Sequence, residues 1–284
     1  MSTIDGQMKV AFQGEPGAYS EAAIFEHFGA QAESLPCETF EQVFERVAQG
    51  KARYGFLPIE NSLAGSIHRN YDLLLQNDLH VVGEHHLRVS HCLIGLPGAR
   101  LEDIESVISH PQALAQCDGT LRRLGVKTEA VYDTAGSVRL VQVEGNPRRA
   151  AIASRRAAQL YGMTILAEAI EDNPLNFTRF LILAAEPVHP RGDAKTSIVF
   201  ALQNAPGALF KALSVFALRD IDLTKIESRP LVGKPWEYLF YIDLAGSTEE
   251  TRVRNALHNL SEFATFLRVL GSYPRHRFVE SPED

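Results

Sequence analysis

Short apolar runs alternate with amphipathic stretches over the first two thirds of the chain. Residues 9–12, 54–59, 107–108 and 150–153 have the composition of buried strands. Turn or capping residues follow each run, and a segment with apolar residues at helical spacing comes next, as in residues 40–47. Strands that alternate with helices predict an α/β domain with a parallel or mostly parallel sheet.

The pattern changes after a stretch rich in Pro and Gly, residues 187–194. Beyond it, strands at 196–202, 223–228, 237–244 and 268–273 are predicted around two helices with apolar stripes. This βαββαβ order is typical of a ferredoxin-like fold with an antiparallel sheet. We therefore expect two domains, residues 8–186 and 195–278, joined by a linker at 187–194.

Polar residues gather where the predicted strands of the first domain end and the next helices begin. Ligands of open α/β sheets bind beyond the carboxyl ends of the strands, and helix N-termini there favour an anion. Each cluster taken alone is better explained as a plain helix cap, so the argument depends on the convergence of the clusters with Arg179. The clusters are Gln13 to Ser20, Glu60 to Ser66, Ser109 to Gln112, Asp133-Thr134 and Ser154.

The stretch 173–180 places a hydroxyl, an amide and a guanidinium at the start of a buried strand. Burial of Arg179 is costly unless an anion meets it, and its planar fork suits a carboxylate or a phosphate. Arg179 is therefore a candidate anion clamp beside Thr178, a reactive or orienting group. The alternative is an Arg that pairs with an acidic residue of the same chain.

Two further side chains are candidates for chemistry in this cleft. Glu60 could act as a general acid if burial raised its pKa, or it could be a first-turn residue that favours its helix. His110 could donate to an anion, or it could be a helix-start residue without a catalytic role. These residues define an anion-binding cleft, but they do not name a reaction.

Composition excludes several classes of protein. The 284 residues carry a net charge of −7, which leaves no basic surface for nucleic acid. The three cysteines, Cys37, Cys92 and Cys117, are far apart, which argues against disulfides and a cysteine zinc site and fits a reducing cytosol. The N-terminal residues do not resemble a signal peptide, and no apolar run is long enough to cross a bilayer. We expect a cytoplasmic protein without a metal, an organic cofactor or a membrane partner.

Several motifs, in this order along the chain, resemble those of the prephenate dehydratase family. The resemblance covers most of the chain and leads us to expect the monofunctional form, without a chorismate mutase segment. The motifs are residues 12–20, 58–66, 109–114, 133–135, 151–154 and 176–180 of the first domain, with 207–209 and 227–230 of the second.

The resemblance implies a fold, an activity and a set of site residues. The fold would be a two-lobed, periplasmic-binding-protein-like α/β domain, with one lobe returning after about Thr164, followed by a regulatory ACT domain. The activity would be a carbon–oxygen lyase reaction, the decarboxylative dehydration of prephenate to phenylpyruvate in L-phenylalanine biosynthesis. Thr178 and Glu60 would be catalytic. The substrate would be bound by Gln13, Asn61, Ser62, Ser66, His110, Thr134, Asn176, Arg179 and Phe180.

The second domain would bind L-phenylalanine as an allosteric effector. Apolar residues 239–241 lead us to expect subunit pairing across its sheet, as a homodimer or a homotetramer. Two alternatives to the main interpretation stay open: arogenate dehydratase, or dual specificity, and a two-lobed ligand sensor without catalysis. The effector-binding residues would be Asn204, Gly207, Ala208, Leu209, Glu227, Ser228 and Arg229.

Overall fold

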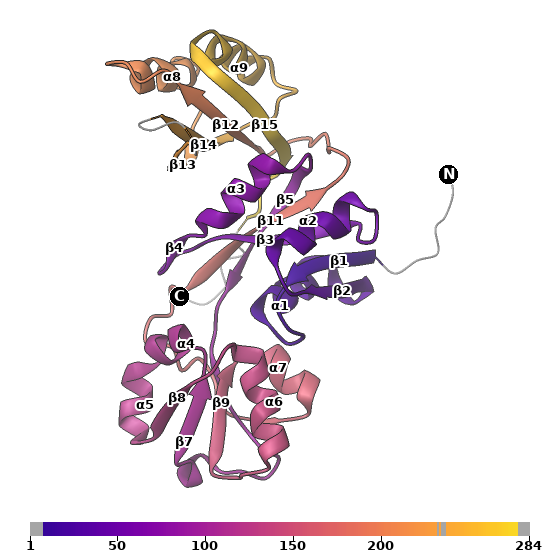
Figure 1. Cartoon of the computed structure of the whole chain (residues 1–284), viewed down its shortest axis with the longest axis vertical. Helices are drawn as coiled ribbons and strands as arrows, with labels where there is room; N and C mark the ends of the chain where they lie inside the picture. The colour runs from indigo at the N-terminus through magenta and orange to yellow at the C-terminus, as the bar shows by residue number, and fades with distance from the viewer. Residues whose placement is uncertain (1–7, 232, 234–236, 278–284) are drawn as a thin grey trace. The chain divides into compact units, whose positions relative to one another are not determined.

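The computed structural model describes residues 8–231, 233 and 237–277 (Figure 1). The described chain divides into two compact units. The first contains the chain up to Asn70 together with His85–Phe180, and the second contains Tyr71–Glu84 together with the chain from Leu181 onward. The expected end of the second domain at residue 278, and part of the turn at 230–235, lie outside the described residues.

The first sheet has the strand order β2-β1-β3-β11-β5. β1 runs parallel to β2 and to β3, as the alternation of strands and helices predicted. Short β4 pairs antiparallel with the end of β3, which places Glu60 opposite Ser66. The strands are β1 (Met8–Gln13), β2 (Ala32–Cys37), β3 (Tyr54–Asn61), β4 (Gly65–Ser66), β5 (His80–Arg88) and β11 (Phe177–Ala184). The helices that follow β1, β2 and β4 are α1 (Tyr19–Phe28), α2 (Phe40–Ala48) and α3 (His68–Gln76).

The second sheet has the order β10-β6-β9-β7-β8, and it is mostly parallel, as expected, with one reversed strand. β6 is the reversed strand, antiparallel to both neighbours. The strands are β6 (Cys92–Gly95), β7 (Ser106–Ser109), β8 (Lys127–Ala130), β9 (Arg149–Ala153) and β10 (Thr164–Ala167). Because β10 belongs to this sheet, the chain returns to the first sheet only at β11, later than expected.

Alternating apolar side chains explain why helices cover both faces of the second sheet. Ile94 and Ile108 pack on one side with Val138, whereas Leu93 and Val107 pack on the other. The helices on the first side are α6 (Thr134–Glu144) and α7 (Arg155–Tyr161), and those on the other are α4 (Pro111–Gln116) and α5 (Asp118–Leu124). Buried Cys117, with φ −118° and ψ 13°, separates α4 from α5.

The C-terminal domain has the predicted βαββαβ order and an antiparallel sheet, β13-β14-β12-β15. Its two helices bury their apolar stripes on one face of this sheet, where Phe200, Phe216 and Leu260 meet (Figure 1). The ferredoxin-like prediction is confirmed. The elements are β12 (Ala194–Leu202), α8 (Ala208–Ala217), β13 (Leu223–Pro230), β14 (Tyr238–Ala245), α9 (Thr251–Phe263) and β15 (Ala264–Pro274).

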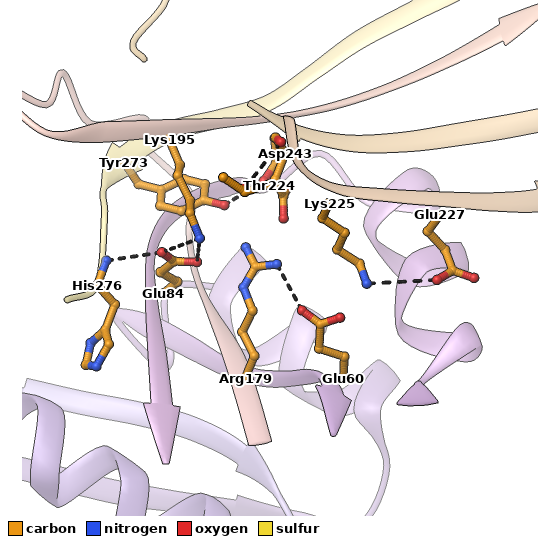
Figure 2. A network of polar contacts seen from close by, with 11 residues as sticks. Glu60, Glu84, Arg179, Lys195, Thr224, Lys225, Glu227, Asp243, Tyr273 and His276 are labelled. Atoms are coloured by element: carbon orange, nitrogen blue, oxygen red, sulfur yellow. Dashed lines mark hydrogen bonds and ion pairs between the residues drawn. The ribbon is translucent and has the colours of Figure 1, made fainter. Parts of the chain in front are cut away.

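The second unit also encloses part of α3 and β5. A buried ion pair joins Lys195 Nζ of β12 to Glu84 Oε1 of β5 at 2.9 Å, and the backbone N–H of His276 donates to the same carboxylate (Figure 2). β15 approaches β5 so closely that a Cβ on Gly271 would lie 2.0 Å from the Val81 carbonyl oxygen. Residues 71–84 are therefore part of the core of this unit.

The residues expected to pair subunits are covered within the chain itself. Leu239 and Tyr241 are only 4% and 3% exposed, and the Tyr241 hydroxyl donates to the Tyr71 carbonyl at 2.9 Å. The argument from exposed apolar residues at 239–241 is therefore wrong for these two side chains. The oligomeric state stays a prediction.

Candidate active site

A cavity of about 300 Å³ in the first unit is lined by residues of the first sheet and by helices that follow strands of both sheets. The ends of β3 and β11 contribute Asn61 and Thr178, and α4 contributes Gln116. The full lining is Tyr19, Ser20, Pro58, Asn61, Ala64, Gly65, Ser66, Ile67, Val89, His91, His110, Gln112, Ala113, Gln116, Thr134, Asn176, Thr178 and Phe180. The lining is thus rich in amides and hydroxyls, and it contains neither a carboxylate nor a Lys or Arg side chain.

The orientation of Asn61 follows from its backbone partners. Its Oδ1 accepts from the N–H groups of Leu63 and Ala64 at 3.0 and 2.9 Å. Its Nδ2 therefore faces β11, where it donates to Asn176 Oδ1 at 2.8 Å and to Thr178 Oγ1 at 3.1 Å. Because the Thr178 oxygen accepts this bond, its own hydrogen can donate to a ligand in the cavity.

His91 is a buried member of the cavity, only 2% exposed. Its Nδ1 lies 2.6 Å from the Tyr19 hydroxyl and its Nε2 lies 2.8 Å from Gln116 Oε1. Burial lowers the pKa of His91, partly offset by the bond to Gln116 and by the charge of Glu171. Burial likewise raises the pKa of Tyr19 well above its usual value. Both groups are therefore neutral at pH 7.

Two helix starts open on the cavity. His110 caps α4, and its Nδ1 accepts from the backbone N–H of Gln112 at 3.2 Å. In the neutral ring this leaves Nε2 as the protonated nitrogen, a donor that suits an anion. Thr134 is the first residue of α6, which Asp133 caps by accepting from Gly136 N. These positions agree with the predicted role of strand-to-helix junctions.

Most of the side chains predicted to bind the substrate reach this cavity, and the two predicted charged groups do not line it. Arg179 is only 6% exposed, and its Nη1 donates to Glu60 Oε1 at 3.2 Å (Figure 2). This is the internal ion pair that the sequence left open as the alternative to an anion clamp. The predicted residues in the lining are Asn61, Ser66, His110, Thr134, Asn176, Thr178 and Phe180.

Two other predicted residues make contacts away from the lining. The Ser62 hydroxyl donates to the Leu175 carbonyl at 2.7 Å and accepts from Phe177 N at 2.9 Å, so it fastens the loop before β11. Gln13 donates to the Glu38 carbonyl at 3.5 Å. Binding roles for Ser62, Gln13, Glu60 and Arg179 stay predictions.

Sequence reasoning missed His91 and Gln116, and it placed Tyr19, Ser20 and Gln112 in the polar clusters without naming them as substrate-binding residues. Tyr19 and Ser20 stand in a motif that carried the family resemblance, and Gln112 stands in another. None of the motifs that carried the resemblance contains His91 or Gln116. Their place depends on the direction of β6 and on the break between α4 and α5, which the sequence pattern did not predict.

A smaller cavity of about 110 Å³ lies in the C-terminal domain. The predicted effector residues Asn204, Ala208 and Leu209 line it, together with Leu202, Gln203, Ala205, Tyr238 and Phe240. Gly207, Glu227, Ser228 and Arg229 are not in this lining. Glu227 lies 3.9 Å from Lys225, and Arg229 donates to Asp72 at 2.8 Å. Effector binding by these seven residues stays a prediction.

Within the described residues, no group of three or more His, Cys, Asp and Glu side chains is placed to hold a metal ion. A search of the same residues for a helix of membrane-spanning length and hydropathy found none.

Fold and cavity together define a ligand-binding α/β domain with two sheets, followed by a regulatory-type βαββαβ domain. The family model for prephenate dehydratase matches residues 10–188, and the model for the ACT domain matches residues 196–262. The chain belongs to the prephenate dehydratase family, whose members are lyases, and it carries an ACT domain.

Relatives and solved structures agree with this assignment. An Arabidopsis thaliana protein named arogenate dehydratase/prephenate dehydratase 1, chloroplastic, is 51% identical over 95% of this chain and 73% of its own length. Arogenate dehydratase 2 of Petunia hybrida is 50% identical over 96% and 73%. A prephenate dehydratase from Arthrobacter aurescens, solved in complex with L-Phe, has a TM-score of 0.85 at 33% identity, covering 94% of this chain and 90% of that one. GqqA, described as a quorum-quenching acylase, has a TM-score of 0.89 at 38% identity, covering 96% and 100%.

Proposed function

We propose that the chain converts prephenate to phenylpyruvate, carbon dioxide and water. The observation that carries this proposal is the Thr178 hydroxyl, held by Asn61 at 3.1 Å in a cavity lined by amides and hydroxyls. Prephenate dianion and one proton balance phenylpyruvate, carbon dioxide and water. The bond to the ring carboxylate breaks, its electron pair enters the ring, and the ring hydroxyl leaves as water.

Aromatisation drives this reaction, so the protein has to protonate the leaving hydroxyl and hold the carboxylates. Thr178 would donate to the leaving oxygen, which lowers the cost of breaking the carbon–oxygen bond. Thr is a poor acid on its own, since a catalytic acid works best with a pKa near ambient pH. Thr178 would therefore orient the leaving group, and a water or substrate group would supply the proton. His110 and the N–H groups at the start of α6 suit the anionic end of the substrate.

The uncharged lining favours prephenate over arogenate, its analogue with an amino group in place of the side-chain ketone. An ammonium group needs a carboxylate or several carbonyl oxygens as partners, and no Asp or Glu lines the described cavity. The names of the Arabidopsis and Petunia relatives favour arogenate as a second substrate. Dual specificity with prephenate preferred is consistent with both observations.

An acylase activity, as in the description of GqqA, has weaker support from this cavity. Amide hydrolysis requires an activated nucleophile. Burial raises the pKa of Cys92 to about 11 and of Cys117 to about 12, so these thiols are poor nucleophiles at neutral pH. The Thr178 oxygen accepts from an amide, which cannot take up its proton.

Turnover of the purified protein with prephenate and with arogenate in parallel tests the proposal. We expect phenylpyruvate from prephenate at a higher kcat/KM than phenylalanine from arogenate. A higher kcat/KM for arogenate would reverse the substrate ranking. No turnover of either substrate, with retained binding of phenylalanine, would leave a ligand sensor.

The ACT domain and the L-Phe complex of the Arthrobacter relative support L-phenylalanine as an effector. The cavity beside Asn204, Ala208 and Leu209 combines an amide with apolar walls, as an amphipathic amino acid requires. Titration calorimetry with phenylalanine is expected to show binding that Ala208→Trp, which fills this cavity, removes. Unchanged binding to that variant would place the effector elsewhere.

A further inference from the structure

A chain of hydrogen bonds crosses the active-site cavity from Thr178 to Tyr19. It runs from Thr178 to Asn61, from Asn61 to Asn176 at 2.8 Å, and from Asn176 to Gln116 at 3.1 Å. It continues from Gln116 to His91 and from His91 to Tyr19, at 2.8 and 2.6 Å. Its five links therefore connect six side chains that five separate segments of the chain supply.

The direction of every bond in this chain follows from two backbone groups. The N–H groups of Leu63 and Ala64 fix Asn61 Oδ1 as an acceptor, so Asn61 Nδ2 donates to Asn176 Oδ1. The Asn176 Nδ2 then donates to Gln116 Oε1. Gln116 Oε1 can only accept, because an amide oxygen carries no hydrogen. The second nitrogen that contacts it, His91 Nε2, must therefore carry the hydrogen.

This requirement assigns the ring of His91. Its Nε2 is protonated and donates to Gln116, which in the neutral ring leaves Nδ1 as the acceptor for the Tyr19 hydroxyl. The single hydrogen of the Tyr19 hydroxyl then points to His91 Nδ1 at 2.6 Å, and the Ser90 carbonyl is the more distant acceptor, at 3.2 Å. The backbone N–H of His91 donates to Glu171 Oε2 at 2.9 Å, so the main chain of His91 is fixed as well.

We propose that His91, protonated on Nε2, is a positioning residue for the dehydration. It holds the Gln116 carboxamide with its oxygen toward Asn176, and Asn176 and Asn61 carry this orientation to the hydroxyl of Thr178. Without the His91 donor, the Gln116 amide can rotate and present its NH₂ group to Asn176 Nδ2, two donors face to face. The proposal rests on the proposed function, because its effect is on the reacting hydroxyl.

Histidine-labelled protein offers a test that does not need the reaction. The ¹⁵N chemical shifts of the His91 ring at pH 7.5 are expected to show a neutral ring with hydrogen on Nε2, and His91→Gln identifies the signal by its loss. A ring protonated on Nδ1 alone would overturn the proposal even in an active enzyme.

Two substitutions separate positioning from packing. His91→Gln keeps a carboxamide donor near the place of Nε2, whereas His91→Leu fills the same space without a donor. We expect kcat for the preferred substrate to fall about 10- to 100-fold in the Leu variant, with KM changed less, and to recover in the Gln variant. Equal loss in both variants, at equal thermal stability, would show that only packing matters.

A double-mutant cycle tests whether His91 acts through Gln116. In a Gln116→Met background, His91→Leu is expected to reduce kcat no further, because the group that His91 positions is already gone. Independent, multiplicative losses would contradict the proposal. If the wild-type protein turned over neither substrate, the proposed function would fail, and the ring protonation measured by NMR would still decide the assignment of His91.

Discussion

At the scale of single residues, the activity proposed here depends on which hydrogen each polar group presents to the cavity. Backbone N–H groups at residues 63 and 64 decide the orientation of Asn61, and Asn61 decides that of Thr178. The sequence predicted Thr178, Asn61, Asn176 and His110 because they lie at strand ends or in recognised motifs. It could not predict that Arg179 pairs with Glu60, since two strands had to be aligned first.

Thr178→Ala is expected to keep the fold and lose about 100- to 10000-fold in kcat, the usual effect of removing a proton-transfer or orienting group. Thr178→Ser is the matched control, because it keeps the hydroxyl and is expected to lose far less. Steady-state kinetics with prephenate measures both. A kcat near that of the wild type in the Ala variant would remove Thr178 from the mechanism.

The cysteines are expected to be unreactive in the folded protein. All three are buried, and burial raises the pKa of each thiol above its usual value, to about 11 for Cys92 and about 12 for Cys117. At pH 8 a thiol of pKa 11 is ionised in about one molecule in a thousand. Titration with a chromogenic disulfide reagent should detect three thiols in denaturant and almost none beforehand. Rapid labelling of the native protein would contradict this burial.

At the scale of helices and strands, the sequence predicted those features that depend on neighbouring residues, namely helix caps and the alternation of strands with helices. Ser154 caps α7, as its place among the polar clusters favoured, and Thr39 caps α2 just before the apolar pattern of residues 40–47 begins. The reversed strand β6 and the break at Cys117 were not readable, because strand direction and helix continuity here depend on packing between distant segments. The same limit explains why Gln116, just before the break, was missed.

The two caps are expected to differ in their contribution to stability. Ser154 Oγ accepts from Ala157 N at 3.0 Å and also donates to the Gly17 carbonyl at 2.6 Å in a buried position. Ser154→Ala should cost about 2 kcal/mol of unfolding free energy, because it removes a cap and leaves a buried carbonyl without this donor. Thr39→Ala, which removes only a cap, should cost about 1 kcal/mol. Urea denaturation of both variants measures the two losses of unfolding free energy. Equal losses would show that the hydrogen bond from Ser154 to the Gly17 carbonyl does not contribute to stability.

At the scale of the whole molecule, the polypeptide passes between the two units after Asn70, Glu84 and Phe180. Sequence patterns predict a domain boundary in the linker at 187–194, because Pro and Gly mark it, and this boundary stays a prediction. They gave no sign that residues 71–84 belong with the C-terminal domain. That assignment depends on buried polar contacts such as those of Glu84 and Tyr71, whose partners lie more than a hundred residues away.

Breaking the pair between Lys195 and Glu84 is expected to destabilise the protein strongly. The two side chains are only 8% and 0% exposed, so Lys195→Met leaves a buried carboxylate without its cation and should cost about 3–5 kcal/mol. The double variant Lys195→Met/Glu84→Met should recover much of this loss, since it removes both charges. Arg122→Ala, which removes an exposed pair with Asp118, should cost at most about 0.5 kcal/mol. Denaturant unfolding measures all three, and a small effect of Lys195→Met would contradict the burial of this pair.

The inclusion of residues 71–84 in the C-terminal unit limits how freely the ACT domain can be exchanged. If the gene were cut at the linker, the upstream product would contain α3 and β5 without the sheet that covers them. The downstream product would contain that sheet without residues 71–84, which pack against it. An ACT domain from a relative would therefore have to be transferred together with that relative's own counterpart of residues 71–84. Recombination between relatives would be tolerated best where both segments come from one parent.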